Sequence, residues 1–214
     1  RTIEGDLVGL ATGVLVYLFF DLMHESVELT GAREPLSWLV LLGSLFDSFV
    51  GVVALEHSQM RRNRPLGTLI SLPYLIALGM GLHNLGEGLA IGASYAHGEW
   101  VLSALLVGGF ALHNGTEGFG IVGAAGQTPL TTQDIVLLGL IAGAPTCLGT
   151  ILSGQDLSPY WTVAFYAFAA GSLLYVIIAL VAVYYTATRR LQVALGLFFG
   201  ISLMYITAML LTLV

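Results

Sequence analysis

Seven long apolar segments make up most of this chain and leave little charged surface for a soluble fold. Each is at least as long as the roughly 20 residues that a helix needs to cross a membrane. They span about residues 6–29, 36–56, 67–96, 99–124, 133–153, 159–187 and 191–213. Charged residues are 9% of the chain, against about 25% in an average soluble domain. The sequence therefore predicts an all-α polytopic membrane helix bundle with seven transmembrane helices, in a single transmembrane domain over residues 1–214.

The arginines are unevenly placed and predict how the helices are oriented. Five of the seven follow the second or the sixth segment: Arg61, Arg62, Arg64, Arg189 and Arg190. Positive charge is retained on the cytoplasmic side of membranes, so these two loops are expected to face the cytoplasm. No basic stripe is present, so nucleic acid is not an expected partner. We expect a multi-pass protein of the plasma (inner) membrane, with the lipid bilayer around it.

A short repeat links the first and sixth segments. Residues 11–17 read Ala-Thr-Gly-Val-Leu-Val-Tyr, and residues 169–175 read Ala-Ala-Gly-Ser-Leu-Leu-Tyr. The two segments are expected to run in opposite directions, and inverted repeats of this kind are typical of transporters. Chance similarity in a chain so rich in apolar residues is the alternative. A true inverted repeat needs a copy of the fifth segment before the first, so an eighth, N-terminal helix is expected upstream of Arg1.

The third and fourth segments each contain one copy of a polar motif, His-Asn-x-x-Glu-Gly. The two copies consist of His83, Asn84, Glu87 and Gly88, and of His113, Asn114, Glu117 and Gly118. On a helix, residues three or four positions apart share a face, so each copy directs three metal-capable groups to one side. At about 1.5 Å per residue, both histidines lie some 20–25 Å from the turn near residue 97. The two copies are therefore expected to face each other near the middle of the membrane.

Burial of these groups needs a compensating partner. A charged side chain at the centre of a membrane helix costs about 2.5–3.5 kcal/mol on the lenient insertion scale. A divalent cation would neutralise both carboxylates and accept the lone pairs of both imidazoles. Nitrogen and oxygen ligands without thiolate suit Zn²⁺, Fe²⁺, Mn²⁺ or Co²⁺. The motifs thus predict a divalent transition metal as substrate, and no organic cofactor is expected.

Other interpretations of the polar core stay open. The four groups could form a buried hydrogen-bond network that joins two helices. A seven-helix zinc-dependent intramembrane hydrolase would need an open metal position, but no third histidine or positioned serine lies at the same depth. A metal-gated or proton channel is a third alternative. No nucleotide-binding loop is present, and we expect a secondary carrier rather than an enzyme.

The paired motifs in successive helices resemble those of the ZIP (Zrt/Irt-like) divalent metal transporters, and of the GufA-like branch in particular. The resemblance covers nearly the whole chain, and it implies that the seven segments match the second to eighth helices of the family. It implies that His83, Glu87, His113 and Glu117 line the primary transport site, and that Asn84 and Asn114 contribute to an adjoining second position. It also implies an elevator-like mechanism that carries zinc, iron, manganese or cadmium toward the cytoplasm.

The chain departs from the pattern of this family in two places. Many relatives have proline before the motif glutamate, where this chain has Gly86 and Thr116. The family commonly has a glutamate before Pro-Leu-Gly in its sixth helix, and Thr146 stands in that place here. The second departure leaves open whether the site takes one metal ion or two.

Two further points are undecided by the sequence. Asp21, His24, Glu25 and Glu28 gather toward the outer end of the first segment, where they form either a solvated helix end or a vestibule that collects cations. Whether the protein forms a homodimer also stays open.

Overall fold

The computed structural model describes residues 4–30, 35–61, 72–125, 129–153 and 158–211, and these form seven α-helices without strands. The helices are α1 (Glu4–Thr30), α2 (Pro35–Arg61), α3 (Leu72–Ala96), α4 (Trp100–Gly123), α5 (Thr132–Leu152), α6 (Pro159–Tyr184) and α7 (Arg190–Leu211). The predicted all-helical bundle is confirmed. α2 continues five residues beyond its apolar segment, and the expected start of the third helix near residue 67 lies outside the described residues.

Five of the described helices are long and apolar enough to cross a membrane. These spans are Gly5–Thr30, Pro35–Ser58, Thr132–Leu152, Tyr160–Tyr184 and Arg190–Met209. The two helices outside this set are α3 and α4, which contain the His-Asn-x-x-Glu-Gly motifs. Histidine, asparagine and glutamate lower the mean hydropathy of both helices. In α3 these polar residues, His83, Asn84 and Glu87, are buried inside the bundle.

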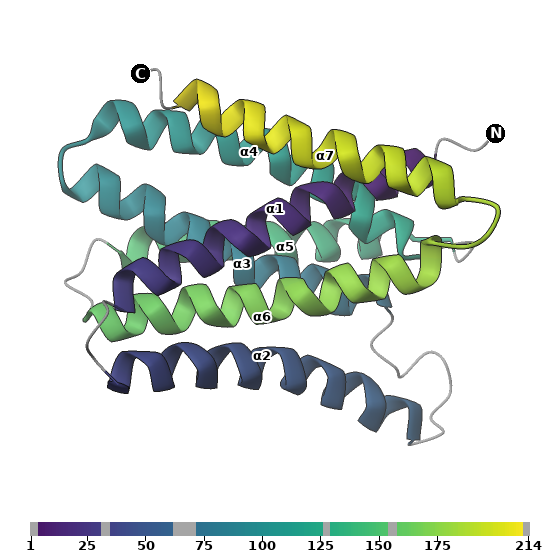
Figure 1. Cartoon of the computed structure of the whole chain (residues 1–214), viewed down its shortest axis with the longest axis horizontal. Coiled ribbons are helices and arrows are strands. Elements are labelled where there is room, and N and C mark those ends of the chain that lie inside the picture. The colour runs from purple at the N-terminus through teal and green to yellow at the C-terminus, as the bar shows by residue number, and fades with distance from the viewer. Residues whose placement is uncertain (1–3, 31–34, 62–71, 126–128, 154–157, 212–214) are drawn as a thin grey trace.

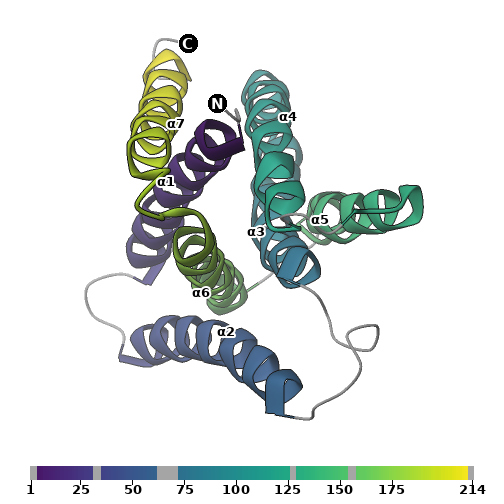
Figure 2. The same cartoon turned by 90° about the vertical axis from the view of Figure 1, so that its right-hand side faces the viewer.

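The helices form two groups that pack against each other. α1, α2, α6 and α7 make the four-helix group, in which α1 packs on α7 and α6, and α6 packs on α2. α3, α4 and α5 make the three-helix group, in which α3 lies between the other two. Figure 1 shows α1 crossing obliquely between α6 and α7, and Figure 2 shows the two groups nearly end-on. The groups meet where α1 packs on α4 and where α3 packs on α6.

Glycines bring neighbouring helices into close contact in both halves of the short repeat. A Cβ atom at Gly13 would lie 2.2 Å from the carbonyl oxygen of Leu197 on α7. A Cβ atom at Gly171 would lie 2.5 Å from the carbonyl oxygen of Leu45 on α2. Both distances are too short for any side chain, and small residues permit such backbone approach between membrane helices. The matching glycines of the repeat therefore have equivalent packing roles on α1 and α6.

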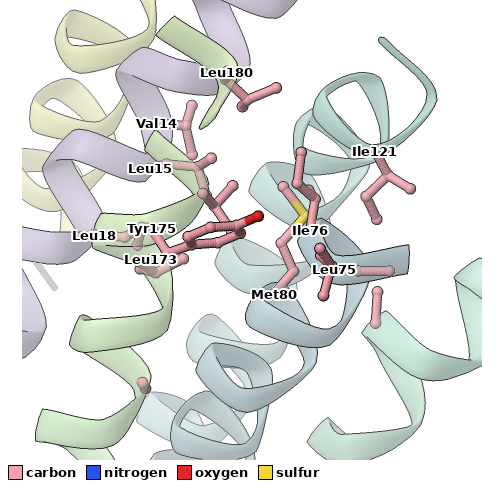
Figure 3. Packing of buried hydrophobic residues seen from close by; sticks show 14 of the residues in the cluster. Val14, Leu15, Leu18, Leu75, Ile76, Met80, Ile121, Leu173, Tyr175 and Leu180 are labelled. Carbon is pink, nitrogen blue, oxygen red and sulfur yellow. The ribbon is translucent and has the colours of Figure 1, made fainter. Parts of the chain in front are cut away.

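A dense apolar cluster fills the space where the two groups meet. Figure 3 labels residues of this cluster from α1, α3, α4 and α6: Val14, Leu15, Leu18, Leu75, Ile76, Met80, Ile121, Leu173, Tyr175 and Leu180. Leu15, Ile76, Met80 and Leu173 are fully buried. Close-packed side chains of this kind exclude water. Among the described residues, this cluster is therefore a closely packed apolar layer between the two helix groups.

Candidate metal site

A tight turn makes α3 and α4 an antiparallel hairpin. Gly98 has a φ of +78°, in the left-handed region that glycine adopts without strain. The amide of Gly98 donates to Tyr95 O and that of Glu99 to Ser94 O, which closes the end of α3. α4 then begins at Trp100 and runs back along α3. The turn lies at the predicted position, so the two motifs come to similar depths.

Three motif side chains from the two helices converge in the interior. His83 Nε2 lies 3.0 Å from Glu87 Oε1, one turn along α3, and 3.7 Å from Glu117 Oε1 on α4. All three residues are buried, with exposed fractions of 1% for His83, 4% for Glu87 and 2% for Glu117. The two copies of the motif thus face each other, as their spacing predicts. An imidazole between two carboxylates is a compact nitrogen and oxygen donor set.

The asparagines of the two motifs have different partners. Asn114 Nδ2 donates to Glu87 Oε2 at 2.9 Å, so it connects α4 to α3. Asn84 Nδ2 donates to Ala142 O on α5, also at 2.9 Å. With both amide nitrogens committed, the side-chain oxygens Asn84 Oδ1 and Asn114 Oδ1 are buried without a described donor. A buried amide oxygen without a donor is costly, and a cation is one group that can satisfy it.

The structure describes only some of the side chains that were predicted to bind the metal ion. His113 lies within α4, but its side chain is outside the described residues. Among the described side chains, no three His, Cys, Asp or Glu residues have the arrangement of a metal-binding group. Thr146 lies on α5 with its carbonyl oxygen against Gly88. The described part of the site is thus His83, Glu87 and Glu117, with the two asparagines beside them.

Comparison with known proteins adds one relative. No protein-family model matches this chain. The chain is 27% identical over 178 aligned residues to an Arabidopsis thaliana protein named "Putative zinc transporter". The alignment covers 80% of this chain and 28% of the relative, so the chain spans less than a third of that protein.

A cavity of about 360 Å³ reaches His83 and Glu87 from one end of the bundle. Its walls come from both helix groups and include Gly86, Phe110, Tyr166 and Thr207. Asp21 and Glu25 of α1 also line it, one helical turn apart. His24 Nε2 lies 3.3 Å from Glu28 Oε1 on an exposed face, and neither residue lines this cavity. The acidic end of the first segment is therefore divided between the cavity and a solvated face.

Sequence reasoning did not identify two of the polar cavity residues. Tyr166 packs against Gly86, because a Cβ atom at Gly86 would lie 3.3 Å from the tyrosine ring. Thr207 comes from α7, far from the motifs in the sequence. Neither residue belongs to a motif, and both lie in strongly apolar segments. Only the packing of α6 and α7 against α3 and α4 brings them to the cavity.

Proposed function

We propose that this protein is a secondary carrier of divalent transition metal ions, with zinc as the first candidate. The observation that carries the proposal is the convergence of His83, Glu87 and Glu117, from two helices, at a cavity within an apolar bundle. Charged groups buried in a membrane are expensive, and in such proteins they commonly mark an ion pathway. The name of the Arabidopsis relative supports metal as the cargo.

Six residues are proposed as the metal-binding set. His83, Glu87, His113 and Glu117 would hold the transported ion between α3 and α4. Asn84 and Asn114 would contribute their side-chain oxygens, which lack a described hydrogen-bond donor, to an adjoining position. The amide nitrogens hold these oxygens in orientation through Ala142 O and Glu87 Oε2. Zinc, iron, manganese and cadmium all remain candidate cargoes, because their ligand preferences overlap.

For the mechanism, we propose that the metal site is accessible from only one side of the membrane at a time. The cavity reaches the motifs from one end, and the apolar cluster of Figure 3 blocks the other. By the arginine placement, the cavity would open to the outside and the cluster would close the cytoplasmic side. Movement of the three-helix group along the four-helix group would then expose the site to the cytoplasm. Such elevator-like sliding moves the ion together with its ligands.

Transport by purified protein in lipid vesicles tests this function. We expect zinc uptake by the parent protein, competition by the other divalent metals, and no requirement for nucleotide. Accumulation of a hydrolysed lipid or peptide without metal flux would instead favour the intramembrane hydrolase. Metal flux that does not saturate with concentration would favour a channel.

The two cavity acids of α1 are expected to assist ion capture. Negative charge at the mouth of a cleft raises the local cation concentration and the association rate, and salt screens the effect. Removal of both charges by Asp21→Asn with Glu25→Gln should raise the KM for uptake about tenfold, with a smaller change in kcat. Uptake kinetics at low and high ionic strength measure this effect.

Glu28→Gln is the matched control, because Glu28 lies on the same helix end outside the cavity. Its KM should equal that of the parent. An equal rise in KM for the control and for the double variant would assign the effect to general surface charge. A double variant with unchanged KM would exclude the acids from ion capture.

A further inference from the structure

Two hydroxyl groups of α6 contact backbone carbonyls of the helices that contain the motifs. Tyr184 donates a hydrogen bond to the carbonyl oxygen of Gly123 at the end of α4. Ser172 Oγ lies 3.0 Å from the carbonyl oxygen of Gly79 on α3 and 2.7 Å from that of Ala169 on its own helix. A serine hydroxyl has one proton, so these two carbonyls compete for it. Tyr184 therefore makes the stronger of the two connections between the helix groups.

The end of α4 explains why this carbonyl is available. The last four carbonyls of a helix have no donor within the helix, and Gly123 is the final residue of α4. The tyrosine hydroxyl donates to this carbonyl, and Tyr184 is buried, with an exposed fraction of 1%. A Cβ atom at Gly123 would lie 2.5 Å from Val8 Cγ2 of α1. The end of α4 is therefore held closely between α1 and α6.

This contact lies at the end of the bundle opposite the cavity. The guanidinium carbon of Arg189 lies 5.5 Å from the centre of the Tyr184 ring, which places the tyrosine beside one of the two arginine-bearing loops. On α1, Val8 lies next to Gly123 at the end of α4, whereas Asp21 lines the cavity. These two residues are separated by about 20 Å at the usual helical rise. The apolar cluster occupies the space between the two levels.

We propose that Tyr184 is a latch of the closed side. Its bond to Gly123 holds the three-helix group against α1 and α6 while the site communicates with the cavity. Sliding of α3 and α4 along the four-helix group moves Gly123 away from Tyr184, so the bond is present in one access state and broken in the other. Loss of this bond therefore favours the state that is open toward the arginine-bearing side. The inference rests on the proposed alternating access.

Thiol labelling of a buried reporter tests the latch without measuring transport. Ile76 is suitable because it is fully buried and lies on the His83 face of α3, two turns toward the latch. The reporter Ile76→Cys is placed in a Cys147→Ala background, since Cys147 is exposed. A membrane-impermeant maleimide is applied from the arginine-bearing side. Tyr184→Phe should raise the labelling rate about threefold to tenfold, the population shift expected for loss of one net hydrogen bond.

Tyr185→Phe is the matched control, because the neighbouring tyrosine has a similar arginine contact without this bond. The guanidinium carbon of Arg190 lies 5.8 Å from the Tyr185 ring, and Tyr185 is 49% exposed. Labelling in this control should equal that of the parent. A second reporter, Thr207→Cys, lies in the cavity. Its labelling from the opposite side should not rise in Tyr184→Phe.

The possible results separate the latch from other effects. A rise at both reporters would indicate general loosening of the fold and would overturn the latch, as would equal labelling of Tyr184→Phe and parent. If Tyr184→Phe does not fold, Ser172→Ala should give a smaller rise at Ile76→Cys, and no rise would overturn the proposal. A parent protein that fails to move metal would overturn the proposed function whatever the labelling shows.

Discussion

Glu87→Gln should reduce metal uptake by at least about 100-fold, because loss even of groups that only orient metal ligands typically costs 10–100-fold in affinity. Glu87 contacts motif residues of both α3 and α4. One of its carboxylate oxygens lies 3.0 Å from His83, and the other accepts the bond from Asn114. Glutamine retains the size and one oxygen but loses the negative charge. Only a function that uses the charge predicts so large a loss.

The same substitution should not destabilise the metal-free protein. Glu87 is 4% exposed and shares its surroundings with Glu117, so removal of one charge relieves the cost of burying two. We expect thermal unfolding of metal-free Glu87→Gln at or above the temperature of the parent, without the stabilisation that zinc gives the parent. The buried-network alternative predicts the reverse, a marked loss of stability without metal.

Glu99→Gln is the matched control for this prediction. Glu99 lies in the turn of the same hairpin, is exposed, and is distant from the motifs. Its uptake and its stabilisation by zinc should equal those of the parent. If Glu87→Gln folds normally and still transports zinc at the rate of the parent, the proposed site is wrong.

The number of helices and the placement of three motif residues follow from local rules. Apolar length predicts seven helices, and the four-residue spacing places His83 and Glu87 on one face of α3. The glycine-containing turn near residue 97 then brings the second motif, which includes Glu117, to a depth similar to that of the first. These inferences need no knowledge of distant contacts, because helix geometry and a short connection determine them.

The surroundings of the two motifs are not predictable in the same way. Asn84 and Asn114 occupy identical motif positions, yet one bonds to α5 and the other to Glu87. The hydroxyl of Tyr184 meets a carbonyl 61 residues away in the sequence. Such contacts depend on which helices become neighbours, and apolar segments of similar composition give little information on that choice. A repeated motif therefore does not imply a repeated environment.

Gly88 and Gly118 provide the sharpest test of this difference, because both end a copy of the motif. A Cβ atom at Gly88 would lie 2.1 Å from the carbonyl oxygen of Thr146, on the backbone of α5. At Gly118, no described atom lies within 4 Å. Gly88→Ala should therefore force α3 and α5 apart and cost about 1–3 kcal/mol of stability. Gly118→Ala should be neutral or slightly stabilising, because alanine favours a helix over glycine by about 1 kcal/mol.

Thermal unfolding and the yield of folded protein in detergent measure both effects. We expect an apparent unfolding temperature about 5 °C lower for Gly88→Ala, and one at least equal to the parent for Gly118→Ala. Equal damage by both substitutions would mean that another helix covers the exposed face of α4, as α5 covers α3. Equal tolerance would mean that α3 and α5 do not pack closely. Either result would change which helices are assigned to the moving group, because that group is defined by the packing of α3 on α4 and α5. It would also bear on the metal site, because Gly88 lies next to Glu87 and any shift of α3 displaces the metal ligands.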